Sequence, residues 1–254
     1  MKKAILYFVA FAAIQMLAGA IVMFVHQMIK GPGADSLGAT ELILTTALMD
    51  VVTLVCFLCL KWAELSPNWL RTRPWGVFFW CALAAFGAIL PSMFIQEMMP
   101  ELPNLAEHEF ELIMTSPFGY IIIGLMAPLV EEIVFRGAIL RALLRWKSNP
   151  WIGILISAAL FSVIHMNPAQ MPHAFLIGIL LGWMYYRTDS IIPGVIYHWV
   201  NNSVAYLLFA FYPDPNIKMI DLFGGSQRTT VMAVAFSLCI LLPAIFQLNL
   251  RMKK

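Results

Sequence analysis

Apolar segments long enough to cross a bilayer recur along the whole chain, and they set the fold class before any motif is considered. A helix needs about 20 apolar residues to span the hydrocarbon core of a membrane. Eight segments reach or approach this length, the fifth and sixth being short, and they lie at about 4–29, 41–60, 75–95, 112–130, 151–166, 172–186, 191–211 and 229–250. We therefore expect an all-α polytopic membrane protein, a bundle of eight transmembrane helices that forms a single domain over residues 1–254.

The composition agrees with a membrane protein and excludes some partners. Hydrophobic residues make up 61% of the chain and charged residues 12%, whereas a soluble domain carries roughly 25% charged residues. A net charge of +2 gives no support for a nucleic-acid partner. The Cys56-x-x-Cys59 pair has no second pair and no nearby histidine, so packing in apolar surroundings is favoured over a metal or redox site.

The first segment resembles a signal peptide in its opening residues only. Met1 is followed by two lysines and an apolar run, and residues 18–20 (Ala-Gly-Ala) resemble a cleavage site. The apolar run continues to Ile29, well past that point, which a cleaved signal peptide would not do. We expect an uncleaved first transmembrane helix whose His26 is an interfacial side chain rather than a ligand.

The distribution of basic residues predicts the orientation, because lysine and arginine are retained on the cytoplasmic side. With both termini in the cytoplasm and eight crossings, 13 of the 16 basic residues fall inside and only Lys30, Lys218 and Arg228 fall outside. The 13 are Lys2, Lys3, Lys61, Arg71, Arg73, Arg136, Arg141, Arg145, Lys147, Arg187, Arg251, Lys253 and Lys254. The compact chain favours an integral protein of a bacterial cytoplasmic membrane.

A charged cluster interrupts the apolar sequence at residues 127–136. In a helix Glu132 and Arg136 are i and i+4 and share a face, whereas Glu131 points about 100° away. One carboxylate is thus neutralised and the other is left over, and Pro128 loosens the helix just before the pair. Charged groups inside a membrane persist where they are paired or do chemistry, so we expect an intramembrane site here. The alternative is a plain salt bridge at the water boundary.

Other polar residues lie in the predicted spans at similar depth. His165 lies in the fifth segment, and His198 and Asn202 share one face of the seventh at i and i+4. With a helical rise of about 1.5 Å per residue, these side chains and Glu131 occupy one broad slab of the membrane. Asp50, in the second segment, has no basic residue within a turn, so it either pairs across helices or is protonated.

Three short motifs in this region resemble the signature of the CAAX prenyl protease and bacteriocin-processing family (CPBP, or Abi) of intramembrane glutamic endopeptidases. The motifs are Glu131-Glu132-x-x-x-Arg136, Phe161-x-x-x-His165 and His198-x-x-x-Asn202. The resemblance covers about residues 112–211, which would be the catalytic core. It implies that Glu131 and His165 activate a water molecule. It also implies that His198 and Asn202 stabilise the oxyanion of the tetrahedral intermediate.

Elementary chemistry agrees with these roles. Peptide hydrolysis needs a base beside the water and donors aimed at the developing oxyanion. Glu132 and Arg136 would support Glu131, since catalytic groups need neighbours that fix them. We therefore predict a membrane endopeptidase that acts on a peptide or protein substrate, whether soluble or membrane-associated, and that needs no cofactor.

Two other functions remain open at this point. Glu131, His165 and His198 also form a possible His2Glu zinc set, as in a metalloprotease, although the sequence contains no HExxH motif. A non-catalytic binding or transport protein is the second alternative, in which the polar cluster holds a ligand or relays protons. The absence of an internal repeat argues against a transporter.

Overall fold

The computed structural model describes residues 1–31, 33, 36–66, 69, 73–213 and 217–252, and this part of the chain contains helices and no strand. The all-α prediction is therefore confirmed. The long helices are α1 (Lys2–Lys30), α2 (Ala39–Cys59), α4 (Trp75–Glu97), α8 (Pro150–Val163), α9 (Met171–Thr188), α10 (Ile192–Phe211) and α12 (Gln227–Arg251). Two short helices, α5 (Glu107–Met114) and α11 (Met219–Leu222), lie in connections.

A continuous helical rod carries the charged cluster. It consists of the π-helical stretch η1 (Tyr120–Met126), α6 (Ala127–Glu132), the π-helical stretch η2 (Ile133–Leu140) and α7 (Arg141–Leu144). The predicted fourth span, 112–130, is thus wrong at both ends. The apolar run continues beyond the two glutamates to Leu140, and because Glu132 and Arg136 neutralise each other the helix does not end there. The motif consequently lies in the middle of the rod.

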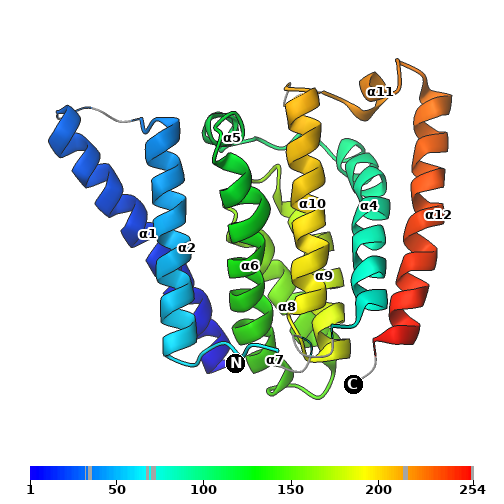
Figure 1. Cartoon of the computed structure of the whole chain (residues 1–254), viewed down its shortest axis with the longest axis horizontal. Coiled ribbons are helices and arrows are strands. Elements are labelled where there is room, and N and C mark those ends of the chain that lie inside the picture. The colour runs from blue at the N-terminus through cyan, green and yellow to red at the C-terminus, as the bar shows by residue number, and fades with distance from the viewer. Residues whose placement is uncertain (32, 34–35, 67–68, 70–72, 214–216, 253–254) are drawn as a thin grey trace.

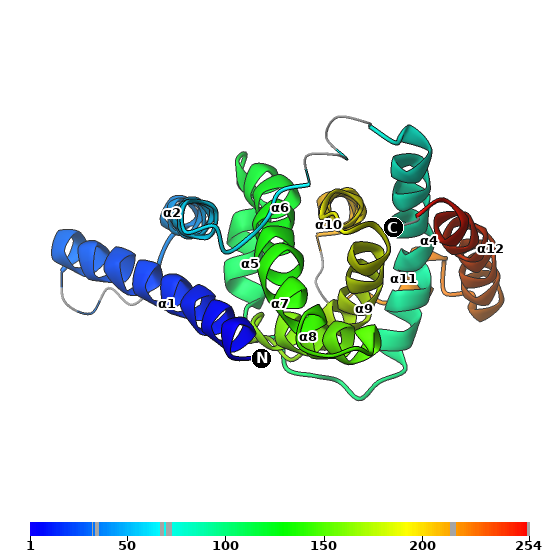
Figure 2. The same ribbon diagram turned by 90° about the horizontal axis from the view of Figure 1, so that it is seen from below.

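The chain runs up and down between two ends of the molecule, as Figure 1 shows. Both termini lie at the same end, as an even number of crossings requires. Arg71, Lys253 and Lys254, which entered the count of basic residues, lie outside the described residues, and the cytoplasmic assignment stays a prediction. Seen from the end that carries the termini (Figure 2), α1 and α2 stand on one side, α12 on the other, and the rod, α8, α9 and α10 lie between them.

In the described part of the chain, four helices are long and apolar enough to cross a membrane by themselves: α1, α2, α4 and α12. The inner helices are shorter or interrupted, and α8 has only 14 residues. They pack closely through small side chains. A Cβ atom added to Gly178 of α9 would lie 3.0 Å from the Cα atom of Ala158 in α8. Small residues at such contacts let helices approach one another inside a membrane.

The connection before α5 lies over the turn between α8 and α9. The backbone N–H of Leu105 donates to Oδ1 of Asn167 (3.0 Å), and Nδ2 of Asn167 donates to Oδ1 of Asn104 (2.8 Å). The N–H of Ala169 donates to the carbonyl of Pro103 (3.3 Å). These bonds fix the turn in which His165 lies.

Candidate active site

Glu132 and Arg136 form an ion pair in the core. Nη1 of Arg136 donates to Oε1 of Glu132 at 2.7 Å, as the i to i+4 spacing predicts. Both side chains are 0% exposed, so the alternative of a salt bridge at the water boundary is wrong. Nη2 of Arg136 also donates to the carbonyl of Gly178 (3.3 Å), and the guanidinium lies 4.5 Å from the centroid of the Phe161 ring. The arginine therefore ties the rod to α8 and α9.

His198 contacts both glutamates. Its Nδ1 atom lies 3.3 Å from Oε1 of Glu132, and its Nε2 atom lies 3.6 Å from Oε2 of Glu131. A carboxylate oxygen accepts, so Nδ1 donates to Glu132 and Nε2 is directed toward Glu131. The side chain of Glu131 is 21% exposed, whereas that of Glu132 is 0% exposed. Of the two neighbouring carboxylates, only Glu131 is accessible from outside the core.

The close approach of α10 to Glu132 depends on Gly194, one turn before His198. A Cβ atom at Gly194 would lie 2.5 Å from Oε2 of Glu132, far inside the normal contact distance. Oε2 is buried and has no hydrogen-bond partner among the residues that the structure describes. The glycine thus provides the space in which the second oxygen of this carboxylate lies.

His165 lies just after the end of α8. Its Nδ1 atom is 2.8 Å from the carbonyl oxygen of Phe161. Because a carbonyl only accepts, Nδ1 carries the proton and the Nε2 atom of the neutral ring keeps its lone pair. The Phe161 ring is nearly perpendicular to two imidazoles, with its centroid 5.1 Å from that of His165 and 5.7 Å from that of His198. His165 and Glu131 share no hydrogen bond or ion pair within the described residues, so their predicted meeting in one cavity stays a prediction.

Asn202 is bound to the rod at a point where the backbone lacks a donor. In the π-helical register of η1, the N–H of Ala127 donates to the carbonyl of Ile122, five residues earlier. The next donor in this register would be residue 128, which is a proline and has no N–H. Nδ2 of Asn202 donates to the carbonyl of Ile123 instead, at 3.0 Å. The loosening expected at Pro128 is therefore present, and α10 makes use of it.

His173, at the start of α9, extends this polar cluster and was not identified from the sequence. Its Nδ1 atom is hydrogen-bonded to the Ser92 hydroxyl of α4, and its Nε2 atom lies 3.5 Å from Nδ2 of Asn201. Asn201 in turn donates to Oδ1 of Asn202 at 3.3 Å. The sequence offered no periodic signal, because the partners of His173 come from two other helices.

Asp50 of α2 faces the same region. It is 5% exposed, and its Oδ2 atom is buried without a hydrogen-bond partner from the described segments. Its carboxyl group is close enough to Glu131 for their charges to repel each other. No ion pair to Asp50 occurs in the described part of the chain, so the predicted alternative of a cross-helix salt bridge has no support.

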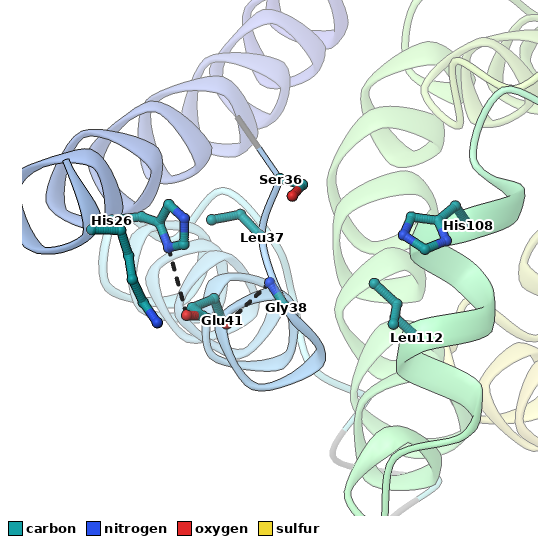
Figure 3. Close-up of a pocket in the computed structure, with 8 residues that line it drawn as sticks. His26, Ser36, Leu37, Gly38, Glu41, His108 and Leu112 are labelled. Carbon is teal, nitrogen blue, oxygen red and sulfur yellow. Dashed lines mark hydrogen bonds and ion pairs between the residues drawn. The ribbon is translucent and has the colours of Figure 1, made fainter. Parts of the chain in front are cut away.

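A separate pocket of about 480 Å³ lies at the end of the molecule away from the termini, between the α1–α2 connection and α5 (Figure 3). In it Nδ1 of His26 lies 3.5 Å from Oε1 of Glu41, and Glu41 also accepts from the N–H of Gly38 (3.0 Å). His26 therefore pairs with a carboxylate where α1 and α2 meet. This arrangement joins the two helices and lies apart from Glu131.

The zinc alternative can be compared with the geometry. Within the described residues, no three His, Cys, Asp or Glu side chains are grouped so that they could hold a metal ion. Glu131 and His198 are neighbours, whereas His165 has no hydrogen bond or ion pair with either in the part of the chain that the structure describes and packs against the Phe161 ring. The proposed set of Glu131, His165 and His198 is thus not assembled as a ligand set in this structure.

The fold and the site together define a polytopic α-helical membrane protein with a glutamate, histidine and asparagine cluster between its inner helices. Residues 113–204 match the family model described as type II CAAX prenyl endopeptidase Rce1-like. This segment contains all three motifs, so the resemblance found in the sequence is confirmed for it.

One curated relative also matches. The chain is 29% identical over 101 residues to "Putative membrane peptidase YdiL" of Bacillus subtilis (strain 168). The aligned segment covers 39% of this chain and 40% of that relative, which is less than half of each protein. No solved structure matches the chain. Both matches are described as membrane or prenyl peptidases.

Proposed function

We propose that this protein is an intramembrane endopeptidase that hydrolyses a peptide bond with a water molecule activated by Glu131. The observation that carries the proposal is the division between two adjacent carboxylates. Glu132 is buried and bound to Arg136, while Glu131 is partly exposed and faces His198. A carboxylate that is accessible and has no ion pair with a lysine or arginine in the described part of the chain is suited to act as a general base.

The other proposed groups complete the reaction. His165 keeps a free Nε2 lone pair, because its Nδ1 proton is bound by the Phe161 carbonyl. It would orient the water with Glu131 and take part in the return of the proton to the leaving amine. His198 and Asn202 would donate to the oxyanion. Because Nδ1 of His198 donates to Glu132, donation from Nε2 requires the imidazolium form, which carries a proton on both nitrogens. Asn202 has a second amide N–H besides the one bonded to Ile123, so one donor stays available.

The neighbouring contacts give these groups a fixed geometry. Arg136 is bonded to Glu132, Glu132 to His198, and Asn202 to η1, so hydrogen bonds join α10 to the rod on both sides of the position of Glu131. Catalysis benefits from such order because groups that are already oriented need no rearrangement in the transition state. The π-helical turns on both sides of α6 agree with a functional role, since such turns occur frequently at functional sites.

The substrate would be a peptide or protein that reaches the site from the membrane or the cytoplasmic side. The family description refers to prenyl substrates, but nothing in the site requires a prenyl group, and we propose only the peptide class. Localisation in a bacterial cytoplasmic membrane with both termini inside belongs to the same proposal, on the basis of the distribution of basic residues.

Substrate trapping tests the function. Full-length protein carrying Glu131→Gln would be expressed beside the native protein, and peptides retained by each after purification would be identified by mass spectrometry. We expect the variant to retain an intact peptide that the native protein cleaves. The Lys147→Gln variant, changed at an exposed position outside the cluster, should cleave that peptide at the native rate. Cleavage by Glu131→Gln at the native rate would overturn the proposal.

A further inference from the structure

A second pocket of about 640 Å³ lies at the end of the molecule that carries both termini. Five basic residues from three parts of the chain line it: Lys2 and Lys3 at the start of α1, Lys61 after α2, and Arg141 and Arg145 at α7. The small side chains of Ala138 and Ala142 leave the space open, and Trp146 contributes an aromatic wall. Basic residues are expected on this face for topology, but topology alone does not require that five of them converge on one cavity.

These charges are poorly neutralised within the protein. Glu64 is paired with Arg141 and lies 3.8 Å from Arg145. Lys2, Lys3 and Lys61 have no ion pair in the described part of the chain. Like charges gathered around a concave surface attract a multivalent or strongly negative group from outside.

Lys61 occupies a backbone position that normally suits glycine. Its φ angle is 55°, in the left-handed region. The N–H of Lys61 donates to Leu58 and that of Trp62 to Phe57, which is the Schellman arrangement at a helix C-terminus. A side chain in this conformation is disfavoured relative to glycine. A lysine here is therefore better explained by its charge than by the helix ending.

Aromatic contacts and a hydrogen bond fix the residues around the pocket, and exposed apolar side chains of α1 lie next to it. The Tyr7 ring is 5.3 Å from that of Trp62 and 6.3 Å from that of Phe57, which joins α1 to the end of α2. Arg141 is further fixed by a hydrogen bond to the carbonyl of Trp62 (3.2 Å). On α1, Ile5 and Leu6 are each 53% exposed. Aromatic residues near the ends of spanning helices are typical of the membrane–water interface.

We propose that this pocket binds the phosphate headgroup of an anionic phospholipid, with the acyl chains along the apolar surface of α1. The argument is independent of the proposed protease activity. A phosphate fits the cationic side chains, and basic pockets between helices at the cytoplasmic interface are a known mode of lipid recognition. The apolar surface next to the cations favours a lipid over a free phosphate ion.

The test measures lipid binding by the full-length protein. Delipidated protein would be titrated with phosphatidylglycerol or phosphatidylcholine, and the bound lipid counted by native mass spectrometry. We expect tighter binding of phosphatidylglycerol, and a loss of about tenfold or more in the double variant Lys61→Gly with Arg145→Gln. Lys61→Gly should keep or raise the melting temperature in lipid-free detergent, because glycine suits this helix end.

Two further variants separate a pocket from general charge attraction. Ala142→Phe keeps every charge and fills the cavity, so it should also weaken phosphatidylglycerol binding. Arg251→Gln removes an exposed charge at the same end of the molecule, on α12 across the bundle, and should bind like the native protein. Unchanged binding in the double variant, or an equal loss in Arg251→Gln, would overturn the proposal. Equal competition by inorganic phosphate at the lipid's own concentration would identify a free anion as the ligand instead.

Discussion

Nδ1 of His198 lies 3.3 Å from Oε1 of Glu132, so the buried carboxylate of the Glu-Glu pair orients the imidazole that faces the accessible one. The same Oε1 atom accepts from Arg136 at 2.7 Å. This one oxygen of Glu132 thus accepts from α10 through His198 and from the rod's own Arg136, which in turn contacts α8 and α9. The two glutamates are consequently expected to respond differently to the same substitution.

Glu131→Gln should give a folded and inactive protein. The amide keeps the volume of the side chain but removes the base, and the ionic contact that it loses within the described residues is the one to His198. Cleavage should fall by at least about 10²-fold, as the loss of a general base predicts. Melting in detergent, followed by light scattering or fluorescence, should be close to that of the native protein.

Glu132→Gln should instead destabilise the protein. Arg136 is 0% exposed and would lose its counter-ion, which for a buried pair costs about 3–5 kcal/mol. Activity should fall as a secondary effect, because His198 and Glu131 lose their fixed positions. Melting curves and a cleavage assay on the purified variant check both points. A stable but inactive Glu132→Gln protein beside an unstable Glu131→Gln protein would require the roles to be exchanged.

Gly194→Ala should disturb the site although it replaces no polar residue. The new methyl group would lie 2.5 Å from Oε2 of Glu132, so α10 or the carboxylate has to move, at a cost of about 1–3 kcal/mol. Gly76→Ala is the matched control, because its Cβ atom would meet only the flexible end of Arg251 at 3.6 Å. Only the Gly194 variant should melt earlier and cleave more slowly. Equal behaviour of the two variants would mean that the contact at Gly194 is unimportant.

The features that could be predicted from the sequence are those that depend on residue spacing within a single helix. The order of the spanning segments and the pairing of Glu132 with Arg136 follow from apolar length and from the i to i+4 rule, and the structure agrees with both. The end of the fourth span was missed because an internally neutralised ion pair does not stop a helix. The roles of Gly194 and His173 were missed because their partners lie on other helices, and no spacing within one segment encodes such contacts.

Treatment with chelators should leave cleavage unchanged. The proposed reaction uses carboxylate, imidazole and amide groups of the chain itself, so no step depends on a metal ion. Purified protein would be assayed before and after exhaustive chelation, with metal content measured by mass spectrometry. Stoichiometric zinc, together with activity that is lost on its removal and restored by its return, would favour the metalloprotease alternative with Glu131, His165 and His198 as ligands.

The last prediction concerns the hydrogen-bond chain that joins α4, α9 and α10. Ser92 is bonded to His173, His173 to Asn201, and Asn201 donates to Oδ1 of Asn202. If Asn202 donates to the oxyanion, Asn202→Ala should lower kcat by about 10²–10³-fold, as for other donors of this kind. His173 would act only through the orientation of that amide. His173→Ala should therefore lower kcat less, with KM little changed.

The double variant distinguishes this role of His173 from a merely structural one. When two residues act as a unit, removing the second after the first has little further effect. His173→Ala combined with Asn202→Ala should thus have nearly the kcat of Asn202→Ala alone. Losses that multiply would mean that His173 acts independently of Asn202, and an unchanged kcat in His173→Ala would remove it from the site. Asn202 also donates to the Ile123 carbonyl, which Pro128 cannot reach with an N–H of its own. Asn202→Ala should therefore also melt at a lower temperature, because the unpaired carbonyl lowers the free energy of unfolding by about 1–3 kcal/mol.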